Sequence, residues 1–487
     1  MKKTDIMELT VEKLHKALET GELTVKKLVE AYLERIHNYD QKGPKLNSVI
    51  CINDDVIKEA EVLDSYYKNY GLKGPLHGVP ILLKDNVHTL KMPTTAGSKS
   101  LEGFLSNEDA SIVKSMKAAG ALIIAKTNLH EFAIWGETIS SIQGQTLNPY
   151  DLTRTPGGSS GGTGASLAAN FGLIGIGTDT INSIRSPSSA NCLVGIRPTV
   201  GLVSKFGVIP YSNTQDVIGP IARTVEDATK LLDVIYGYDP KDPKTAWSVG
   251  RVNQSYSNFL NEKGLEHKRI GILKAFFGQK DIHKTTNREV NNAITILRKN
   301  GATLIDLDEA FDSFELVQNV SVHLYDLKDH LNAYLDDLPD SAPVRSVAEI
   351  LGSGKYHPGI KENLEKANLL STGTSIYNER MMRRIVIQNR LMQLMATYQL
   401  DAIVYPHQKQ LVCKVGGSQN ERNGVLASVT GFPSICVPAG FSDPTDCAKL
   451  GVPIGMEILG RPFSEGILIE IAYAYEKLSK VRRVPSM

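Results

Sequence analysis

The sequence TPGGSSGG at residues 155–162 decides much of how this chain can fold. It lies in the densest glycine cluster, because eight of the 41 glycines fall within residues 157–177. Glycine lacks a Cβ, so such clustering indicates that the backbone approaches another group closely. Further along, residues 165–170 predict a helix of small side chains, residues 173–177 predict a buried strand, and a polar turn surrounds Ser183. The order of loop, helix, strand and turn is typical of an α/β protein.

Helical and apolar stretches alternate along most of the remaining chain. The first forty residues predict two helices and residues 111–119 predict another. The expected strands are the short apolar runs at residues 79–83, 121–125, 269–273, 402–405, 434–439 and 452–459, and a last helix is expected from residue 464 onward. This alternation predicts one large α/β domain with a central mixed β-sheet that helices cover on both faces.

The composition argues against several kinds of partner. Among 487 residues, 54 are Lys or Arg and 53 are Asp or Glu, so the formal net charge is +1. A balance this close to zero disfavours nucleic acid or an anionic membrane as the main partner. The five cysteines contain no C-x-x-C pair, which favours free thiols in a reducing compartment. The N-terminus lacks an apolar signal-peptide core and no run approaches 18 apolar residues, so a cytoplasmic protein is expected.

Lys84 follows directly after the apolar run at residues 79–83. A lysine at the end of a buried strand loses hydration, which lowers its pKa and lets the neutral amine act as a base. The position also suits a lysine whose long side chain reaches the surface. Both interpretations stay open on this feature alone.

The stretch at residues 155–162 has three interpretations. A phosphate-binding loop is discounted because the Gly-Lys-Ser/Thr ending of a P-loop is missing. Residues 158–162 also match G-x-S-x-G, which would make Ser160 a nucleophile, but the polar residues 148–154 before it do not resemble the strand that this motif needs. The third interpretation is a pair of serines, Ser159 and Ser160, in a larger catalytic site.

A further serine lies in GTDTINSIRSP at residues 177–187. Because this run follows a buried strand, Ser183 is expected at the carboxyl end of the strand, where such sheets place their chemistry. Backbone amides at Thr180, Ile181 and Asn182 could form an oxyanion hole for acyl transfer. The alternative is a polar turn in which the serine bonds its own backbone.

Taken together, these motifs closely resemble the amidase signature family. In that family a lysine after G-V-P-I-x-x-K-D, the first serine of G-G-S-S-G-G and the serine of G-T-D-x-G-G-S-I-R-x-P form a Ser–Ser–Lys triad. Here the lysine motif reads GVPILLKD at residues 78–85. Further matches cover essentially the whole chain and include PTTAGS (93–98), KTNLHE (126–131), GIRPT (195–199), GPIART (219–224), GFP (431–433) and GRPF (460–463).

The resemblance implies the amidase signature fold and an amidase that needs no metal or organic cofactor. Ser183 would attack the amide carbonyl and become an acyl-ester, Ser159 would pass the proton from a cis peptide, and neutral Lys84 would be the base. Water would then hydrolyse the ester. The implied partner is a small-molecule or peptide amide substrate, without nucleic acid or membrane, and a homodimer is compatible with the sequence.

Within this fold we expect four segments. They are an N-terminal helical segment (1–70), a catalytic core (71–235), a variable substrate-side region (236–400) and a C-terminal part of the same sheet (401–487). The polar residues 239–268 lack periodicity and are expected to form a long surface connection.

The substrate pocket is not assigned from the sequence. Residues 275–400 are expected to supply much of it, and the candidates are Phe276, His323, Tyr325 and Tyr334, although aromatic residues more often pack in a core. The histidines, including His88, His130 and His323, lack the spacing of metal ligands and are interpreted as structural or surface residues.

Two branches of the family fit the sequence. The runs LYDLKDHLNAYL (324–335) and GMEILG (455–460) resemble the free-standing, peptide-amidase-like branch. This favours a free-standing amidase over the glutaminase component of the glutamyl-tRNA amidotransferase, its A-type chain, which hydrolyses glutamine inside a complex.

The chain departs from the family pattern next to its expected nucleophile. Ile181 and Asn182 stand where the family usually has two glycines. Both keep a backbone N–H, but isoleucine adopts a positive φ only at real cost. If the family's loop needs a positive φ at position 181, this turn must be built differently. We predict an altered substrate preference and keep a catalytically degraded member with a binding role as the alternative.

Overall fold

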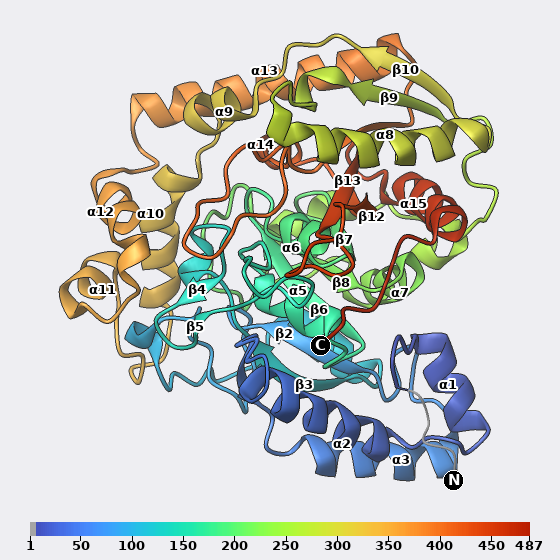
Figure 1. The fold of residues 1–487 in the computed structure, drawn as a ribbon. Helices are drawn as coiled ribbons and strands as arrows, with labels where there is room; N and C mark the ends of the chain where they lie inside the picture. Colours follow the sequence, from blue (N-terminus) through green and yellow to red (C-terminus); the bar gives the residue numbers. More distant parts are fainter. Residues whose placement is uncertain (1–5) are drawn as a thin grey trace.

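The structure is a computed structural model that describes residues 6–487. Its centre is a mixed sheet of 11 strands (Figure 1). From one edge to the other the strands are β1 (Val49–Ile52), β3 (Leu122–Thr127), β2 (Pro80–Lys84), β6 (Ile174–Asp179), β8 (Val217–Ala222), β7 (Val194–Arg197), β12 (Ser434–Phe441), β13 (Pro453–Leu459), β11 (Ala402–Pro406), β9 (Arg269–Leu273) and β10 (Thr303–Leu307). The prediction of one large α/β domain on a central mixed sheet is confirmed.

The pairing of β2 and β6 brings two candidate segments together. Strand β2 runs parallel to both neighbours, β3 and β6, and β9 runs parallel to β10 and β11. The other neighbouring pairs are antiparallel. Because Leu83 pairs with Ile176, the carboxyl ends of β2 and β6 lie side by side. Lys84 and Thr178, which follow those positions, therefore meet at the same edge of the sheet.

Helices cover the sheet. They are α1 (Val11–Glu19), α2 (Val25–Arg35), α3 (Val56–Tyr70), α4 (Ser111–Ala118), α5 (Gly161–Ala168), α6 (Arg185–Ala190), α7 (Val225–Ile235), α8 (Lys284–Lys299), α9 (Ser313–Glu315), α10 (His323–Asp336), α11 (Val347–Ser353), α12 (Lys361–Leu369), α13 (Ser375–Thr397), α14 (Val425–Thr430) and α15 (Glu465–Ser479). Helices α5 and α6 contact each other and the sheet, and α4, α7, α15 and α8 contact one another in succession. Every residue of β2, β3, β6, β7, β8, β11 and β13 is buried, which requires cover on both faces.

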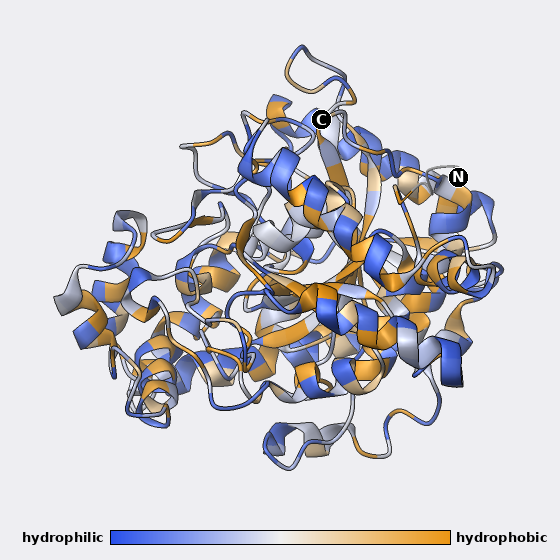
Figure 2. Ribbon diagram, turned by 90° about the horizontal axis from the view of Figure 1, so that it is seen from below, coloured by the Kyte–Doolittle hydropathy of each residue, from blue (hydrophilic) through white to orange (hydrophobic). Residues whose placement is uncertain are grey.

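The hydropathy of the chain follows these layers. In Figure 2 the strands of the central sheet are largely orange, whereas the helices around them show blue outer faces. Helices α10, α11 and α12, on the left of Figure 1, share a separate apolar cluster with residues of segments 96–104, 132–134 and 209–211. No helix within residues 6–487 combines the length and the apolar character needed to cross a membrane.

Three segments of the structure have boundaries or contents that differ from the sequence-based prediction or make it more precise. Helix α5 begins at Gly161, four residues earlier than predicted, and its first two glycines fit where a Cβ would collide with the Thr138 side chain or the Asn128 backbone. Strand β6 covers Ile174–Asp179 and is thus displaced towards Ser183. Residues 239–268 contain no α-helix or strand and only two short 3-10 turns, Pro243–Ser248 and Tyr256–Phe259.

Candidate active site

Lys84 is the last residue of β2 and is fully buried. Its strand lies between β3 and β6, so the side chain cannot reach the surface, and the surface interpretation of this lysine is wrong. Its Nζ lies 2.8 Å from Ser159 Oγ and 2.7 Å from Thr178 Oγ1. Burial lowers the pKa of Lys84 to about 7, in spite of the attraction of Asp179 and Asp216. A neutral amine at this place can accept a proton from a hydroxyl.

Ser159 lies in what we call the glycine segment, residues 157–162. The Gly158–Ser159 peptide bond is cis. The Ser159 carbonyl accepts a hydrogen bond of 3.0 Å from the backbone N–H of His130. A Cβ on Gly162 would lie 2.2 Å from the carbonyl oxygen of Asn128, so only glycine fits there. The glycine cluster thus serves close backbone packing that presents Ser159 to Lys84.

Ser183 lies in what we call the Ser183 turn, residues 180–183, between β6 and α6. Within the described residues, the backbone N–H groups of Ile181, Asn182 and Ser183 donate to no protein group. Neither Ile181 nor Asn182 has a positive φ, so the turn is built without the conformation that glycine would permit. Successive unpaired amides next to a serine can stabilise a developing oxyanion.

Hydrogen bonds from neighbouring segments hold the carbonyl groups of the Ser183 turn. The Ile181 carbonyl accepts hydrogen bonds from Ser428 Oγ at 2.5 Å and from Arg185 Nη2 at 2.7 Å. Ser183 O accepts from Ser160 N at 3.3 Å, which connects the turn to the glycine segment. With the carbonyls engaged in this way, the amide hydrogens are left for another acceptor.

Buried charges lie beneath the turn. Arg185 bonds both oxygens of Asp179, at 3.0 and 3.1 Å, and Arg197 reaches Asp179 at 2.8 Å. Burial alone would raise the pKa of Asp179, but the two guanidinium groups outweigh it and hold the pKa below its ordinary value. This network fixes the end of β6 from which the turn starts.

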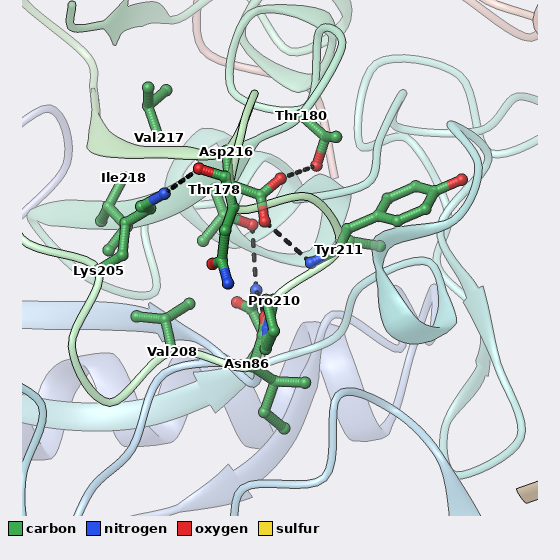
Figure 3. Close-up of a pocket in the computed structure, with 13 residues that line it drawn as sticks. Asn86, Thr178, Thr180, Lys205, Val208, Pro210, Tyr211, Asp216, Val217 and Ile218 are labelled. Atoms are coloured by element: carbon green, nitrogen blue, oxygen red, sulfur yellow. Dashed lines mark hydrogen bonds between the residues drawn. The ribbon is translucent and has the colours of Figure 1, made fainter. Parts of the chain in front are cut away.

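Asp216 ties the turn to the next loop, as Figure 3 shows. It accepts hydrogen bonds from Thr180 Oγ1 at 2.6 Å and from the backbone N–H groups of Tyr211 and Ser212 at 2.9 and 2.8 Å. Asp216, Thr180 and Tyr211 border a cavity of about 10 Å³ that Asn86 and Thr178 also line. Its volume is close to the minimum for one water molecule.

The structure therefore brings the three expected residues, Lys84, Ser159 and Ser183, into one place. Of the hydrogen bonds that would link them, the one to Ser183 Oγ is not formed. Lys84 and Ser159 are hydrogen bonded. No hydrogen bond joins Ser183 Oγ to a described residue, and Ser183 is largely buried, with 4% of its surface exposed. Catalytic hydrogen bonds of this kind are often long before substrate binds.

Three supporting residues were not predicted. Thr178 lies inside the quoted run at residues 177–187, and its place at the end of a strand beside Lys84 is a signal that could have identified it. Asp216 and Ser428 are distant in sequence from Ser183, so their contacts carried no local signal.

Three of the four unassigned pocket candidates contact neighbouring side chains in the structure. Phe276 is fully buried and packs on Tyr405 with 4.9 Å between ring centroids. His323 Nδ1 lies 2.7 Å from Ser321 Oγ, and Tyr334 forms a hydrogen bond with His88. Within residues 6–487, no group of three or more His, Cys, Asp or Glu side chains is placed to hold a metal ion.

Known proteins resemble this chain over its whole length. The family model described as Amidase matches residues 27–469. A probable amidase of Arabidopsis thaliana is 37% identical, with 99% of this chain and 92% of the relative covered. The A-type chain of the glutamyl-tRNA(Gln) amidotransferase of Thermoanaerobacter pseudethanolicus is 32% identical, covering 99% and 98%.

Solved structures agree with these relatives. The native peptide amidase of Stenotrophomonas maltophilia superimposes with a TM-score of 0.90 at 36% identity and covers 99% of both chains. A peptide amidase in complex with the competitive inhibitor chymostatin gives the same TM-score and identity over 99% of both chains. The chain belongs to the amidase signature family and is an enzyme of the hydrolase class that acts on carbon–nitrogen bonds.

Proposed function

We propose that this enzyme hydrolyses a carboxylic or peptide amide to the acid and ammonia or an amine, through an acyl-enzyme on Ser183. The observation that carries the proposal is the buried 2.8 Å contact between Lys84 Nζ and Ser159 Oγ. Lys84 has a pKa lowered by burial to about 7, so near neutral pH a large fraction is neutral and able to take a proton.

In the first half-reaction Ser183 Oγ forms a bond to the amide carbon while its proton passes through Ser159 to Lys84. The carbonyl oxygen becomes an oxyanion, which the free N–H groups of Ile181, Asn182 and Ser183 stabilise. The carbon–nitrogen bond then breaks as the proton returns through Ser159 to the leaving nitrogen. This is a lysine-based variant of nucleophilic catalysis by serine and a neighbouring base.

In the second half-reaction water attacks the Ser183 ester. Lys84 again accepts a proton through Ser159, the carbon–oxygen bond to Ser183 breaks, and the acid leaves. The serine and the neutral lysine are then restored. Every proton transfer uses groups of this chain.

A free-standing amidase is the form of the enzyme we favour. The similarity to peptide amidase at TM-score 0.90 and 36% identity supports it more than the 32% identity to an amidotransferase component does. Purification of the tagged protein under mild conditions separates the two, because an amidotransferase component would require co-purifying partners for glutaminase activity.

The test is covalent labelling with a fluorophosphonate followed by peptide mass spectrometry. Modification of wild type at Ser183, and none in Ser183→Ala, is the expected result, together with release of ammonia from simple amides by wild type only. A folded wild type that neither reacts at Ser183 nor hydrolyses any amide, amidated peptides included, would favour the degraded-member alternative.

A further inference from the structure

Arg422 carries a charge that no described residue neutralises by direct contact. Its guanidinium makes no hydrogen bond and no ion pair within residues 6–487, and it stacks over the ring of Trp135 at 5.9 Å. The side chain is half-buried, and burial lowers the pKa of Arg422 below its usual value. A half-buried guanidinium without a protein partner has lost part of its hydration, and a bound anion would offset that cost.

The backbone around Arg422 places it where the two catalytic segments meet. A Cβ on Gly136 would lie 2.9 Å from Arg422 Nη1, and a Cβ on Gly158 would lie 2.8 Å from the Gly136 carbonyl carbon. On the other side, a Cβ on Gly424 would lie 2.8 Å from Asn182 Cβ. Arg422 therefore packs on Gly136, which packs on the glycine segment, and it lies two residues before Gly424, which packs on the Ser183 turn.

His130 adds a second unpaired donor. The N–H of Glu137 donates to His130 Nδ1 at 3.2 Å, so in the neutral ring Nε2 carries the hydrogen. Nε2 of His130 is buried and has no hydrogen-bond partner among the described residues. Burial, and then the positive charges of His357, Arg422 and Lys84, lower the pKa of His130 to about 3, which keeps the ring neutral. His130 is also joined to the site directly, because its backbone N–H donates to Ser159 O.

The nearest acidic group does not satisfy these donors. Glu137 attracts Arg422 electrostatically, but its two oxygens accept from the backbone N–H groups of Gln419 and Gly136, at 2.8 and 3.1 Å. Gln419, which also packs on Gly136, has a buried Nε2 without a partner. Unpaired donors therefore gather around Arg422, alongside the unpaired acceptors Gln408 Oε1 and Glu131 Oε1 of the described residues. A carboxylate at this place could bind the guanidinium with both oxygens.

We propose that Arg422 and His130 Nε2–H form a carboxylate-binding subsite beside Ser159 and Ser183, so that the preferred substrates are amides that also carry a carboxylate. This inference rests on the proposed amidase function and names its substrate class. Arg422 is the specificity-determining residue of the subsite, and His130 is its neutral second donor.

The test compares matched pairs of amides. Succinamate and succinamide differ in a carboxylate on the acyl part, whereas N-acetylglycine and N-isobutylacetamide differ in a carboxylate on the leaving amine. Wild type should prefer the charged member of one pair, and the identity of that pair tells which side of the scissile bond faces Arg422.

In Arg422→Gln the preference in kcat/KM should fall by about 10- to 100-fold, because a charged hydrogen-bonding partner is lost. Arg422→Lys should recover part of this preference, since lysine keeps the positive charge but cannot donate the two parallel hydrogen bonds of a guanidinium.

Controls keep this test independent of folding and of the proposed chemistry. Arg288→Gln removes an exposed arginine that pairs with Asp443, and it should leave both preferences unchanged. Thermal unfolding must show that Arg422→Gln is folded, and calorimetry with succinamate on Ser183→Ala reads binding without turnover. Wild type that hydrolyses the neutral amides with no charge preference, or equal preferences in wild type and Arg422→Gln, would overturn the subsite while leaving the amidase function intact. Absence of hydrolysis of every amide would instead overturn the amidase function.

Discussion

The glycine segment and the Ser183 turn position neighbouring serines by opposite means. In the glycine segment the absence of side chains lets the backbone pack closely, because a Cβ on Gly162 would come within 2.2 Å of the Asn128 carbonyl oxygen. The Ser183 turn contains no glycine and is held by side chains from far along the chain, among them Ser428 and Asp216. Substitutions in the glycine segment should therefore mainly reduce stability. Loss of a side chain that holds the Ser183 turn should mainly reduce the reaction rate.

The largest effect is expected from the residue that joins the two regions. Lys84 contacts Ser159 in the glycine segment and Thr178 on the strand that leads to the Ser183 turn. In Lys84→Met, kcat/KM should fall on the order of 10⁴-fold or more, as for the loss of a triad member. Stability at pH 7 should not fall, because an apolar side chain of similar length replaces a buried amine. Steady-state hydrolysis and thermal unfolding measure the two effects.

The pH dependence of wild type provides the internal check. In the proposed mechanism Lys84 is the base, and burial lowers its pKa to about 7, so kcat/KM should rise as the pH increases through about 7. Its pKa is lower in the folded than in the unfolded chain, so the unfolded chain binds more protons between pH 7 and 10.5. This makes the contribution of Lys84 to stability more favourable as the pH rises through that window. The stability difference between Lys84→Met and wild type should therefore shrink as the pH rises from 7 to 10.5. For catalysis, a kcat/KM that stays constant down to pH 5.5 would exclude Lys84 as the base.

The second-largest effect is expected in the glycine segment. Gly162→Ala should cost about 3 kcal/mol or more, because backbone atoms of Asn128 and Ser48 cannot move away from the new methyl group. Chemical denaturation measures the loss, and soluble yield reports it if the variant does not fold. Gly373→Ala is the matched control: a Cβ there meets nothing within 4 Å, so its stability should stay within about 0.5 kcal/mol of wild type. Equal stabilities for the two variants would contradict the packing account.

What could be predicted from the sequence follows the same division. The motifs around Lys84, Ser159 and Ser183 could be identified because they are contiguous, and the strands appeared as short apolar runs. The start of α5 at Gly161 was missed because a tertiary fit overrides the low helix propensity of glycine. Ser428 and Asp216 were missed because their contacts with the turn span 247 and 36 residues. Single-sequence patterns hold no record of such long-range hydrogen bonds.

The third prediction removes one distant support of the Ser183 turn. Ser428 Oγ donates to the Ile181 carbonyl and accepts from Arg185 Nη2 at 3.1 Å. In Ser428→Ala, kcat should fall on the order of 10-fold, less than the 10²- to 10³-fold lost when an oxyanion donor itself is removed. Stability should drop by only about 1 kcal/mol for the lost hydrogen bonds.

The control for Ser428 lies on the same helix. Within residues 6–487, Thr430 Oγ1 bonds only the backbone of α14, at 2.8 Å to Leu426 and 3.1 Å to Ala427. Thr430→Val should therefore leave kcat unchanged while costing a similar or smaller amount of stability. If both variants lost activity in proportion to stability, Ser428 would be a general part of the packing and not a support of the turn.

The smallest effect is expected where the sequence departs from its family. Since Asn182 does not have a positive φ, glycine at this position relieves no strain, and the backbone N–H is kept in either case. The Asn182 Nδ2 group is buried without a partner, so removing the side chain forfeits no hydrogen bond from that atom. Asn182→Gly should leave kcat/KM within a few-fold of wild type, and Asn182→Ala should be more stable than Asn182→Gly by roughly 0.5–1 kcal/mol, the usual entropic cost of glycine. Parallel urea unfolding and amide hydrolysis of the two variants measure both quantities. A gain of tenfold or more in kcat/KM for Asn182→Gly, absent in Asn182→Ala, would mean that backbone freedom limits the turn, and the long-range supports would then not be sufficient to shape it.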